Sequence, residues 1–382
     1  MRQYLLIPGP TPLPDEVLAA SARQMLNHRG PEFGRLLAET LAALRRIFLT
    51  RHVILPFAAS GTGGLEAAVV NLCSPGDEVV VVCGGVFGDR FAAIAEAYGL
   101  TVIRVSVPWG QAVDPEAVRE ALRQAPRARA VLVTQSETST GVRHDVAAIA
   151  SVVRDSPALM VVDAVSSLGA IELRTDDWGL DVVVTGSQKA LMAPPGLALI
   201  SVSDRAWEAV REARLPRFYW SFERMRSELG APEVYTPFTP AISVVYALHA
   251  GLRLVETEGL EARWARHRRV AEAVRAGVRA LGLRVVPKDQ DASETVTAVW
   301  LPDGTDDGAL LKRLRVEHGV VLGGGQGPMR GKIFRFGHLG WVPDGDVLAG
   351  LRALEAVLAQ IVGPVGRGAD AAALEVLTRA PA

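Results

Sequence analysis

One lysine in this sequence stands where its amine could do covalent chemistry. Lys189 lies within residues 186–196, between the apolar runs 181–185 and 197–202. Both runs are rich in Val, Leu and Ile and are bounded by Gly and Pro, which predicts two buried strands joined by a turn that carries the lysine. A lysine in a site of low dielectric has a lowered pKa, and its neutral amine forms Schiff bases. Taken alone, the pattern favours a lysine that caps a turn in solvent.

A carboxylate at the end of an earlier apolar run favours a chemical role for Lys189 instead. Residues 159–163 read Leu-Met-Val-Val-Asp, which predicts a strand with Asp163 at its carboxyl end, where open α/β sheets bind ligands. A pyridoxal phosphate enzyme needs a lysine that holds the aldehyde as an imine. It also needs an acid that keeps the pyridine nitrogen protonated, so that the ring can accept electrons. Lys189 and Asp163 together therefore favour this cofactor.

Four motifs carry a family resemblance. They are Gly-Ser-Gln-Lys-Ala-Leu at 186–191, Pro-Pro-Gly at 194–196, Ser-Gly-Thr-Gly-Gly at 60–64 and Glu-Thr-Ser-Thr-Gly at 137–141. Together they resemble the class V aminotransferases of fold type I, which use pyridoxal 5'-phosphate. The most similar branch is that of the alanine–glyoxylate and serine–glyoxylate (or serine–pyruvate) aminotransferases. The resemblance covers most of the chain, from about residue 8 to about residue 339.

The resemblance implies an α/β fold of two domains. We expect a large cofactor-binding domain with a mostly parallel seven-stranded sheet and a smaller C-terminal α+β domain. The expected division is an N-terminal arm at 1–20, the large domain at 21–255 and the small domain at 256–382. The arm is similar to one that crosses onto a partner subunit in the family, which implies a homodimer with a shared active site.

The order of apolar segments agrees with such a fold. Predicted strands alternate with helical segments, which is typical of a doubly wound α/β domain. The proline-rich residues 8–14 should run extended over the surface until a helix starts near Asp15. A long basic helix at 260–281 should link the domains, with its arginines on a solvated face. The expected strands are 52–57, 78–83, 102–107, 130–134, 284–286 and 296–301, and the other expected helices include 32–48, 115–124, 146–154 and 309–318.

Bulk properties narrow the function classes. The 382 residues are 49% hydrophobic and 22% charged, as in a globular protein, and the net charge of -1 disfavours nucleic-acid and membrane partners. Two cysteines, Cys73 and Cys83, give neither a disulfide framework nor a zinc site, so we expect no metal. Proline interrupts the first ten residues before a signal core could form, and no run approaches the ~20 apolar residues of a membrane helix. A cytoplasmic location and small-molecule substrates are expected.

The glycine turn after the first buried strand is a candidate phosphate site. Ser60, Gly61 and Thr62 precede a predicted helix, whose first N–H groups and dipole favour an anion. The glycine spacing is not that of the dinucleotide fingerprint. The family resemblance adds Gln188 as a phosphate ligand, and it assigns Tyr235 and Thr239 to the phosphate of the neighbouring subunit. Because the spacing of the last two departs by one residue from some members, Thr239 carries over better than Tyr235.

The resemblance also implies ligands for the ring and the substrate. Phe87 would stack on the pyridine and Val165 would form the floor opposite, although the residues alone favour Phe87 as a core residue. Thr138 would contact the phenolic oxygen and the substrate. Arg335 alternates with apolar neighbours on a predicted strand, and its planar guanidinium suits the α-carboxylate that the family binds there. We expect Glu137, next to Thr138, to be structural.

The implied reaction is a ping-pong transamination through a Lys189 Schiff base. A small amino acid, alanine or serine, would donate its amine, and a 2-oxo acid such as glyoxylate or pyruvate would accept it. An aminophosphonate or ureidoglycine is an alternative donor. A cysteine desulfurase is disfavoured because both cysteines come early and Phe87 replaces the usual histidine, and intact Lys189, Asp163 and Arg335 disfavour a non-catalytic subunit.

Overall fold

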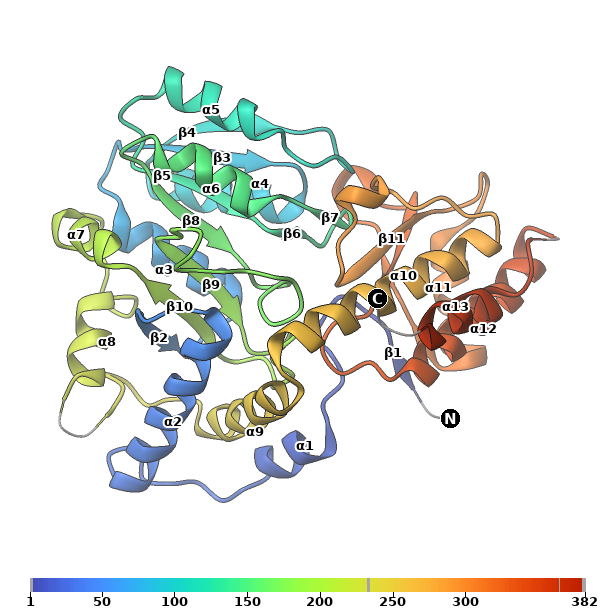
Figure 1. Cartoon of the computed structure of the whole chain (residues 1–382), viewed down its shortest axis with the longest axis horizontal. Coiled ribbons are helices and arrows are strands. Elements are labelled where there is room, and N and C mark those ends of the chain that lie inside the picture. The colour runs from blue at the N-terminus through green and yellow to red at the C-terminus, as the bar shows by residue number, and fades with distance from the viewer. Residues whose placement is uncertain (1–2, 232–233, 364, 380–382) are drawn as a thin grey trace.

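The chain folds into a large and a small lobe that a long helix connects. The computed structural model describes residues 3–231, 234–363 and 365–379. Figure 1 shows the large lobe in blue to yellow and the small lobe in orange and red, with α10 (Leu260–Ala280) between them. Within the described ranges no helix combines the length and apolarity needed to cross a membrane.

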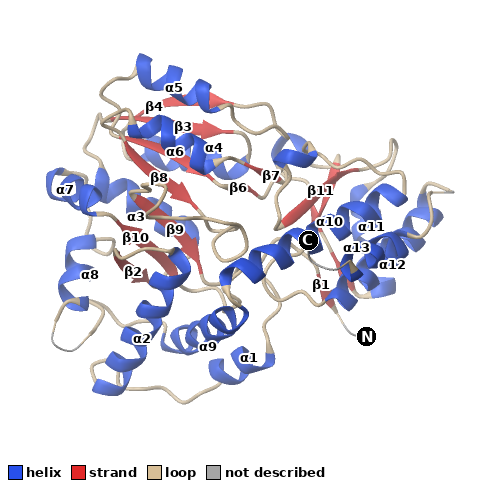
Figure 2. Cartoon of the chain, in the orientation of Figure 1, coloured by secondary structure: helices blue, strands red, loops and turns tan. Residues whose placement is uncertain are grey.

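The large lobe contains the expected mostly parallel seven-stranded sheet. The strand β10 is antiparallel to both of its neighbours, and every other neighbouring pair is parallel. The strand order is β2 (Val53–Phe57), β10 (Ala198–Val202), β9 (Val182–Gly186), β8 (Leu159–Asp163), β5 (Ala130–Thr134), β3 (Glu78–Cys83) and β4 (Thr101–Ser106). The central strands are buried along their whole length, because helices cover both faces (Figure 2).

The two faces of the sheet carry separate hydrophobic cores. Along β8, Met160 and Val162 join one core while Leu159 and Val161 join the other, since successive side chains of a strand point to opposite faces. One core includes α2 (Pro31–Phe48), α5 (Pro115–Gln124), α6 (Val146–Arg154) and α9 (Ile242–Glu258), and α1 (Asp15–Ser21) adds Val17 to it. The other includes α3 (Gly61–Leu72), α4 (Val86–Ala97), α7 (Asp204–Glu212) and α8 (Phe222–Leu229).

Helix starts follow from local capping. The side chains of Asp114, Asp145 and Ser203 accept hydrogen bonds from the first backbone N–H groups of α5, α6 and α7. Pro115 occupies the first position of α5, where a missing N–H costs nothing. Polar residues at these positions therefore determine where the chain stops being extended and starts to coil.

The small lobe packs helices on an antiparallel sheet, as expected for an α+β domain. Its sheet has the order β11 (Val296–Trp300), β14 (Ile333–Gly337) and β13 (Gly323–Gly324), and its core includes α11 (Asp307–His318), α12 (Asp344–Ile361) and α13 (Ala369–Thr378). The predicted strand at 284–286 is wrong as a regular strand, because only an isolated bridge joins Val285 to Val299. The division at residues 20 and 255 stays a prediction.

The expectation that residues 8–14 run over the surface is wrong in part: Pro8, Thr11 and Pro14 are buried, whereas Pro10 is exposed. The residues just before them join the small lobe. The strand β1 (Tyr4–Leu5) pairs in parallel with β12 (Val320–Val321) of the small lobe, where Figure 1 shows its blue ribbon among orange and red elements. Leu6 is buried in the small-lobe core, and its carbonyl accepts a hydrogen bond from the N–H of Gly337 at 2.8 Å. The backbone N–H and C=O groups of β12 thus find hydrogen-bond partners in β1, a pairing that the sequence pattern did not indicate.

Two arginines of α10 also contradict the expected solvated face. Arg263 is 1% exposed and Arg275 is 9% exposed. Both follow helical spacing with buried His267, Val270 and Val274, so they belong to the buried side of the helix. A count of charges along the helix could not show this, because burial depends on what α10 packs against.

Candidate active site

Lys189 lies on the connection between β9 and β10, at the carboxyl edge of the parallel strands. The N–H of Ser187 donates to the carbonyl of Leu197 at 3.0 Å, which closes the base of this loop. The half-buried Lys189 donates from Nζ to the carbonyl of Pro8 at 2.5 Å. Burial lowers the pKa of Lys189 to about 8; the charge of Asp163 opposes this change, and those of Arg335 and Arg90 add to it. The lysine is therefore not a solvated turn residue.

Asp163 ends β8 and is 3% exposed. Its carboxylate accepts hydrogen bonds from the N–H of Val165 at 2.9 Å and from the hydroxyl of Thr134 at 3.2 Å. Burial raises the pKa of Asp163, and these two hydrogen bonds and the charge of Lys189 act in the opposite direction. Because β8 and β9 are parallel neighbours, the acid and the lysine reach the same edge of the sheet.

The glycine turn opens α3 beside this edge. Ser60 is the N-cap residue, but its side chain makes no capping hydrogen bond, so the first N–H groups of α3 have no side-chain acceptor there. A Cβ on Gly61 would lie 2.5 Å from a methyl group of Val165, which explains the glycine and places Val165 against the turn. Thr62 accepts a hydrogen bond from Arg90 at 3.2 Å. The turn therefore presents backbone donors and an arginine on one side.

Phe87 lies in the first turn of α4, where Arg90 covers its ring at 4.8 Å from the centroid. The N–H groups of Phe87 and Gly88 both donate to the carboxylate of Glu137 at 3.1 Å. Glu137 therefore anchors the start of α4, which agrees with the structural role expected for it. The sequence analysis did not identify Arg90 as a site residue. Its position shortly after the end of the buried strand β3 was the feature that could have indicated it.

Thr138 joins the two lobes. Its hydroxyl donates to Ser166 at 2.8 Å, and its carbonyl accepts from Arg335 at 3.2 Å. Arg335 also donates from Nε to the carbonyl of Gly324 at 2.9 Å, and burial lowers its pKa. In the part of the chain that the structure describes, no carboxylate lies within 4.0 Å of this guanidinium. Within the described residues, Arg335 is thus a buried cation whose hydrogen bonds go to the backbone carbonyls of Gly324 and Thr138.

The remaining predicted ligands fall into two groups. The side-chain oxygen of Gln188 is buried and has no hydrogen-bond partner among the described residues, so it is free to bind a ligand. Tyr235 and Thr239 lie on the loop before α9; Arg29 stands 5.8 Å from the Tyr235 ring, and Thr239 lines a hollow with Tyr219. Their expected role involves a second subunit and stays a prediction.

The backbone at Pro8 and Gly9 is a further part of the site that the sequence did not reveal. Gly9 has a φ of 122°, and a Cβ there would lie 2.6 Å from Nζ of Lys189. Thr11 donates its hydroxyl to the carbonyl of Lys189 at 3.2 Å. The N-terminal segment therefore covers the lysine, and glycine is the residue that fits beside it.

Comparisons with known proteins agree on one family. The model of the aminotransferase class-V family matches residues 3–327. The "Soluble hydrogenase, small subunit" of Synechococcus sp. is 46% identical over 94% of both chains. The L-aspartate–glyoxylate aminotransferase of Paracoccus denitrificans is 37% identical over 97% of this chain and 95% of its own, and the serine–glyoxylate aminotransferase of Methylorubrum extorquens is 35% identical over 93% and 90%.

A solved structure of a known aminotransferase has a similar fold over the whole chain. The crystal structure of ureidoglycine–glyoxylate aminotransferase from Bacillus subtilis superposes with a TM-score of 0.94. That protein is 31% identical, and the match covers 99% of both chains. The similarity therefore includes both lobes and the junction between them.

Proposed function

Because this chain belongs to the class V aminotransferases and depends on pyridoxal phosphate, we propose that Lys189 and Asp163 are its catalytic residues. The observation that carries the proposal is the amine of Lys189, whose pKa is lowered to about 8, at the same sheet edge as the buried Asp163. At pH 7 such an amine is neutral about 300-fold more often than one with the ordinary pKa of 10.5. A neutral amine is the form that attacks a carbonyl and accepts a proton.

The residues present fit the three reactive parts of the cofactor. Lys189 offers an amine for the aldehyde, Asp163 a carboxylate for the pyridine nitrogen, and the start of α3 uncapped N–H groups for the phosphate. We assign Ser60, Gly61 and Thr62 to the phosphate. The side-chain amide of Gln188 would donate an N–H to the phosphate. Its oxygen, which is buried without a hydrogen-bond partner in the described chain, can accept from a donor group of a ligand.

The cofactor supplies an electron sink, and the chain supplies position and proton transfer. Lys189 would hold the cofactor through its amine. When that amine is free, Lys189 would take the proton from the substrate Cα as a general base and give it back as a general acid. Asp163 would hold a negative charge at the pyridine nitrogen and so favour its protonation. Phe87 and Val165 would lie against the ring, and Thr138 would bind its phenolic oxygen.

Arg335 binds the α-carboxylate of the substrate in this proposal. Its guanidinium is buried and has no carboxylate within 4.0 Å in the described chain, so a substrate carboxylate would supply the missing counter-ion. A carboxylate accepts two parallel hydrogen bonds from a guanidinium, which also orients the substrate Cα. The contact of Arg335 with the carbonyl of Thr138 fixes the guanidinium at the loop of the large lobe.

The proposed substrates are a small amino acid, alanine or serine, and an oxo acid, glyoxylate or pyruvate. Glyoxylate is common to the names of three matched proteins, whereas their donors are L-aspartate, serine and ureidoglycine. An aminophosphonate or ureidoglycine remains the alternative donor. Nothing in the described site favours the hydrogenase activity that names another relative: burial raises the pKa of Cys73 to about 12 and of Cys83 to about 11, so neither thiol is a ready metal ligand.

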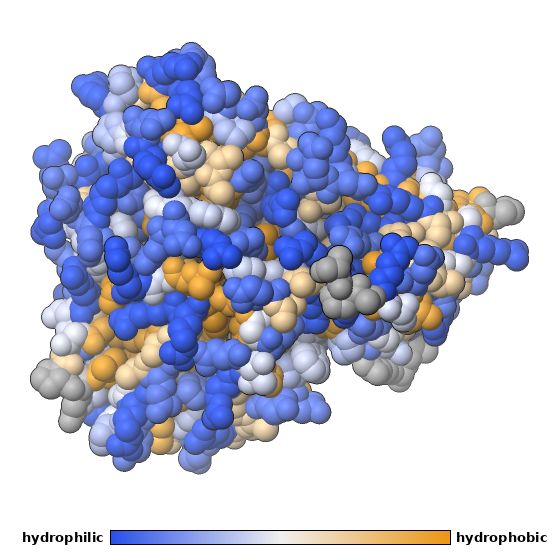
Figure 3. Space-filling model, viewed as in Figure 1, coloured by the Kyte–Doolittle hydropathy of each residue, from blue (hydrophilic) through white to orange (hydrophobic). Residues whose placement is uncertain are grey.

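We further propose a homodimer in the cytoplasm. Tyr235 and Thr239 would reach the phosphate of the partner's cofactor. Phe218 is 66% exposed and contacts Phe238 near that loop, as a covered interface would explain. Figure 3 shows a mostly hydrophilic face with smaller hydrophobic areas, several of them on the large lobe.

The decisive experiment compares the chain with Lys189→Ala. Both proteins are loaded with pyridoxal phosphate, reduced with borohydride and digested, and mass spectrometry locates the attached cofactor. We expect attachment at Lys189 and, in the variant, loss of both attachment and turnover by at least ~10³-fold. Turnover is measured with serine, alanine, aspartate, ureidoglycine and an aminophosphonate against glyoxylate and pyruvate. A variant that keeps either property would contradict the role of Lys189.

A further inference from the structure

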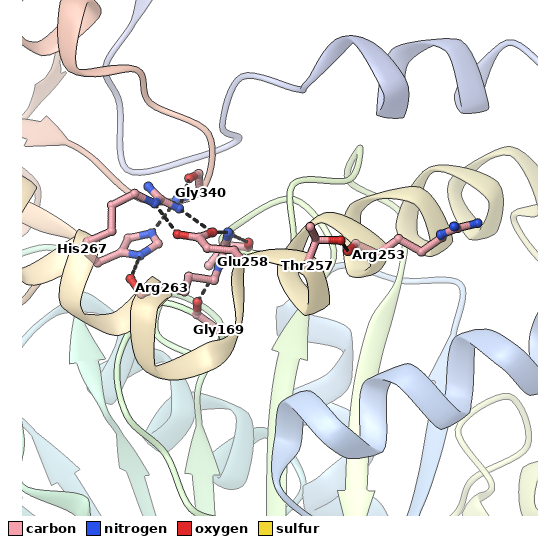
Figure 4. A network of polar contacts seen from close by, with 9 residues as sticks. Gly169, Arg253, Thr257, Glu258, Arg263, His267 and Gly340 are labelled. Carbon is pink, nitrogen blue, oxygen red and sulfur yellow. Dashed lines mark hydrogen bonds and ion pairs between the residues drawn. The ribbon is translucent and has the colours of Figure 1, made fainter.

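The junction between α9 and α10 contains a buried arginine whose contacts reach both catalytic loops. Figure 4 shows Arg263 among Glu258, Gly169 and His267. Its Nε donates to the carbonyl of Gly169 at 2.8 Å, and a terminal nitrogen donates to the carbonyl of Ala190 at 2.5 Å. The other terminal nitrogen pairs with Glu258 at 2.6 Å. One guanidinium therefore uses all three of its nitrogens.

The two carbonyls belong to the segments that carry the catalytic side chains. Ala190 directly follows Lys189, and Gly169 is six residues after Asp163 on the connection that leaves β8. Arg263 thus joins the loop of the lysine to the loop of the acid through one rigid planar group. It touches neither side chain, so any effect on chemistry would be one of position.

The cluster of Arg263, Glu258, Arg266 and His267 also contacts the small lobe at Gly340. Nε2 of His267 accepts the N–H of Gly340 at 3.1 Å, while its Nδ1 contacts the carbonyl of Arg263 at 2.8 Å. Both contacts are satisfied together by a neutral ring with the proton on Nδ1, and burial lowers the pKa of His267 well below its ordinary value. Arg266 pairs with Glu258 at 2.5 Å and donates to the carbonyl of Gly340 at 3.3 Å.

Gly340 connects this cluster to the substrate side of the site. It lies three residues after the end of β14, the strand that carries Arg335. A Cβ on Gly340 would lie 3.1 Å from the carbonyl oxygen of Lys189, so the two backbones are in contact. The cluster therefore fixes the small-lobe loop after β14 against the lysine loop of the large lobe.

We propose that Arg263, with Glu258 and His267, is a positioning residue that sets the separation of Lys189 and Arg335 across the two lobes. The inference rests on the proposed function, in which those two groups bind the cofactor and the substrate. The proton-transfer step needs the amine within hydrogen-bond reach of the substrate Cα. A displacement of 1 Å far from the reacting atoms can cost ~10²-fold in rate.

A lysine at position 263 would keep the positive charge but could not make all the contacts of the arginine. Its ammonium is a point charge that could keep the pairing with Glu258, but it lacks the planar fork that reaches the carbonyls of Gly169 and Ala190 together. Arg263→Lys is therefore the informative variant. Arg275→Lys is its matched control, because Arg275 is a buried arginine on the same helix that donates to the carbonyl of Ser293, away from the lysine loop.

The first readout needs no turnover. Apoprotein is mixed with pyridoxal phosphate, and the rate at which Lys189 bonds to the aldehyde, with loss of water, is followed by absorbance from pH 6 to 10. Asp163, Arg335 and Arg90 are the charged groups that act on the amine. We expect the rate to rise with pH through about 8 in the parent and the control. In Arg263→Lys the midpoint should move upward, since a loosened loop lets water reach the ammonium.

The second readout is local. Hydrogen exchange of the apoprotein should become at least ~10-fold faster at residues 187–193 and 338–342 in Arg263→Lys, and kcat should fall ~10-fold or more. The control should change each by less than ~3-fold. If Arg263→Lys does not fold, Glu258→Gln, which removes only the counter-ion, is examined with the same readouts and the same expected directions.

The outcomes separate this inference from the proposed function. If Arg263→Lys matches the control in pH midpoint, exchange and kcat while Lys189 still binds the cofactor, the positioning role is wrong and the proposed function stands. If the borohydride experiment finds no cofactor on Lys189 in the parent protein, the proposed function is wrong, and the positioning role that rests on it is wrong as well.

Discussion

Two buried arginines stand on either side of the lobe junction, and their surroundings differ. Arg263 has every nitrogen paired, one of them with the carboxylate of Glu258. Arg335 donates to two backbone carbonyls and has no carboxylate within 4.0 Å among the residues that the structure describes. Burial lowers the pKa of both, that of Arg263 to about 10. Guanidinium groups nevertheless remain protonated in proteins at neutral pH.

The difference separates a positioning group from a binding group. A charge taken out of water is costly, and a protein that places one in its interior has to neutralise it or leave room for something that does. Arg263 pairs with the carboxylate of Glu258 within the chain, so its hydrogen bonds serve to hold the loops of Gly169 and Ala190 together. Arg335 has no carboxylate in direct contact among the described residues, although the charge of the buried Glu137 acts on it. This is the arrangement that its proposed role as a carboxylate-binding group requires.

The largest effect should follow from removing the negative charge at the sheet edge. Asp163→Asn keeps the size of the side chain and can still accept the hydrogen bond from Val165. It should lower kcat by ~10³-fold or more, because the charge that favours a protonated pyridine nitrogen is lost. Steady-state kinetics measures the loss, and a melting curve of the apoprotein serves as the control. A loss below tenfold would mean that Asp163 is structural.

An intermediate effect should distinguish the two arginines by kinetics. Arg335→Lys keeps the charge but loses the fork, so KM for the amino donor and for glyoxylate should rise ~10²-fold. The dissociation constant of pyridoxal phosphate, titrated by fluorescence, should change by less than threefold. Equal losses for substrate and cofactor would remove Arg335 from the carboxylate site.

The smallest effect is a difference in stability, and it tests the comparison most directly. Arg263→Met should lower the free energy of unfolding by about 3 kcal/mol or more, because it leaves two buried carbonyls without their donor and leaves Glu258 with Arg266 as its remaining partner. Arg335→Met also leaves two carbonyls without their donor, but it removes a buried cation that has no carboxylate in direct contact among the described residues, so the change should stay within about 1 kcal/mol. Urea unfolding of the apoproteins measures both. If the two variants lose equal stability, the distinction between the arginines is wrong.

The large lobe could be predicted from the sequence, and so could the positions of Lys189 and Asp163 at the ends of neighbouring strands, because each rests on local patterns; their catalytic role stays a prediction. Runs of Val, Leu and Ile with glycine at their ends predicted the buried strands of the sheet. The lysine between two such runs, together with Asp163 at the end of another, indicated the cofactor. The comparisons confirm the family and the cofactor.

What the sequence could not show depends on contacts between distant segments. The carbonyl of Pro8 reaches Lys189, 181 residues away, and Arg263 reaches Gly169 across 94 residues. No periodicity in the sequence records such pairs. The arginines of α10 were misplaced for the same reason: a helix shows which residues share a side, and only its neighbours decide which side is buried.

The pairing of β1 with β12 has a consequence for how the molecule is made. Tyr4 and Leu5 are synthesised more than 300 residues before their partners Val320 and Val321. Contacts so distant in sequence form late in folding, since the intervening chain has to be ordered first. The carbonyl of Pro8, which accepts from the amine of Lys189, therefore takes its place among the last parts of the protein to become ordered.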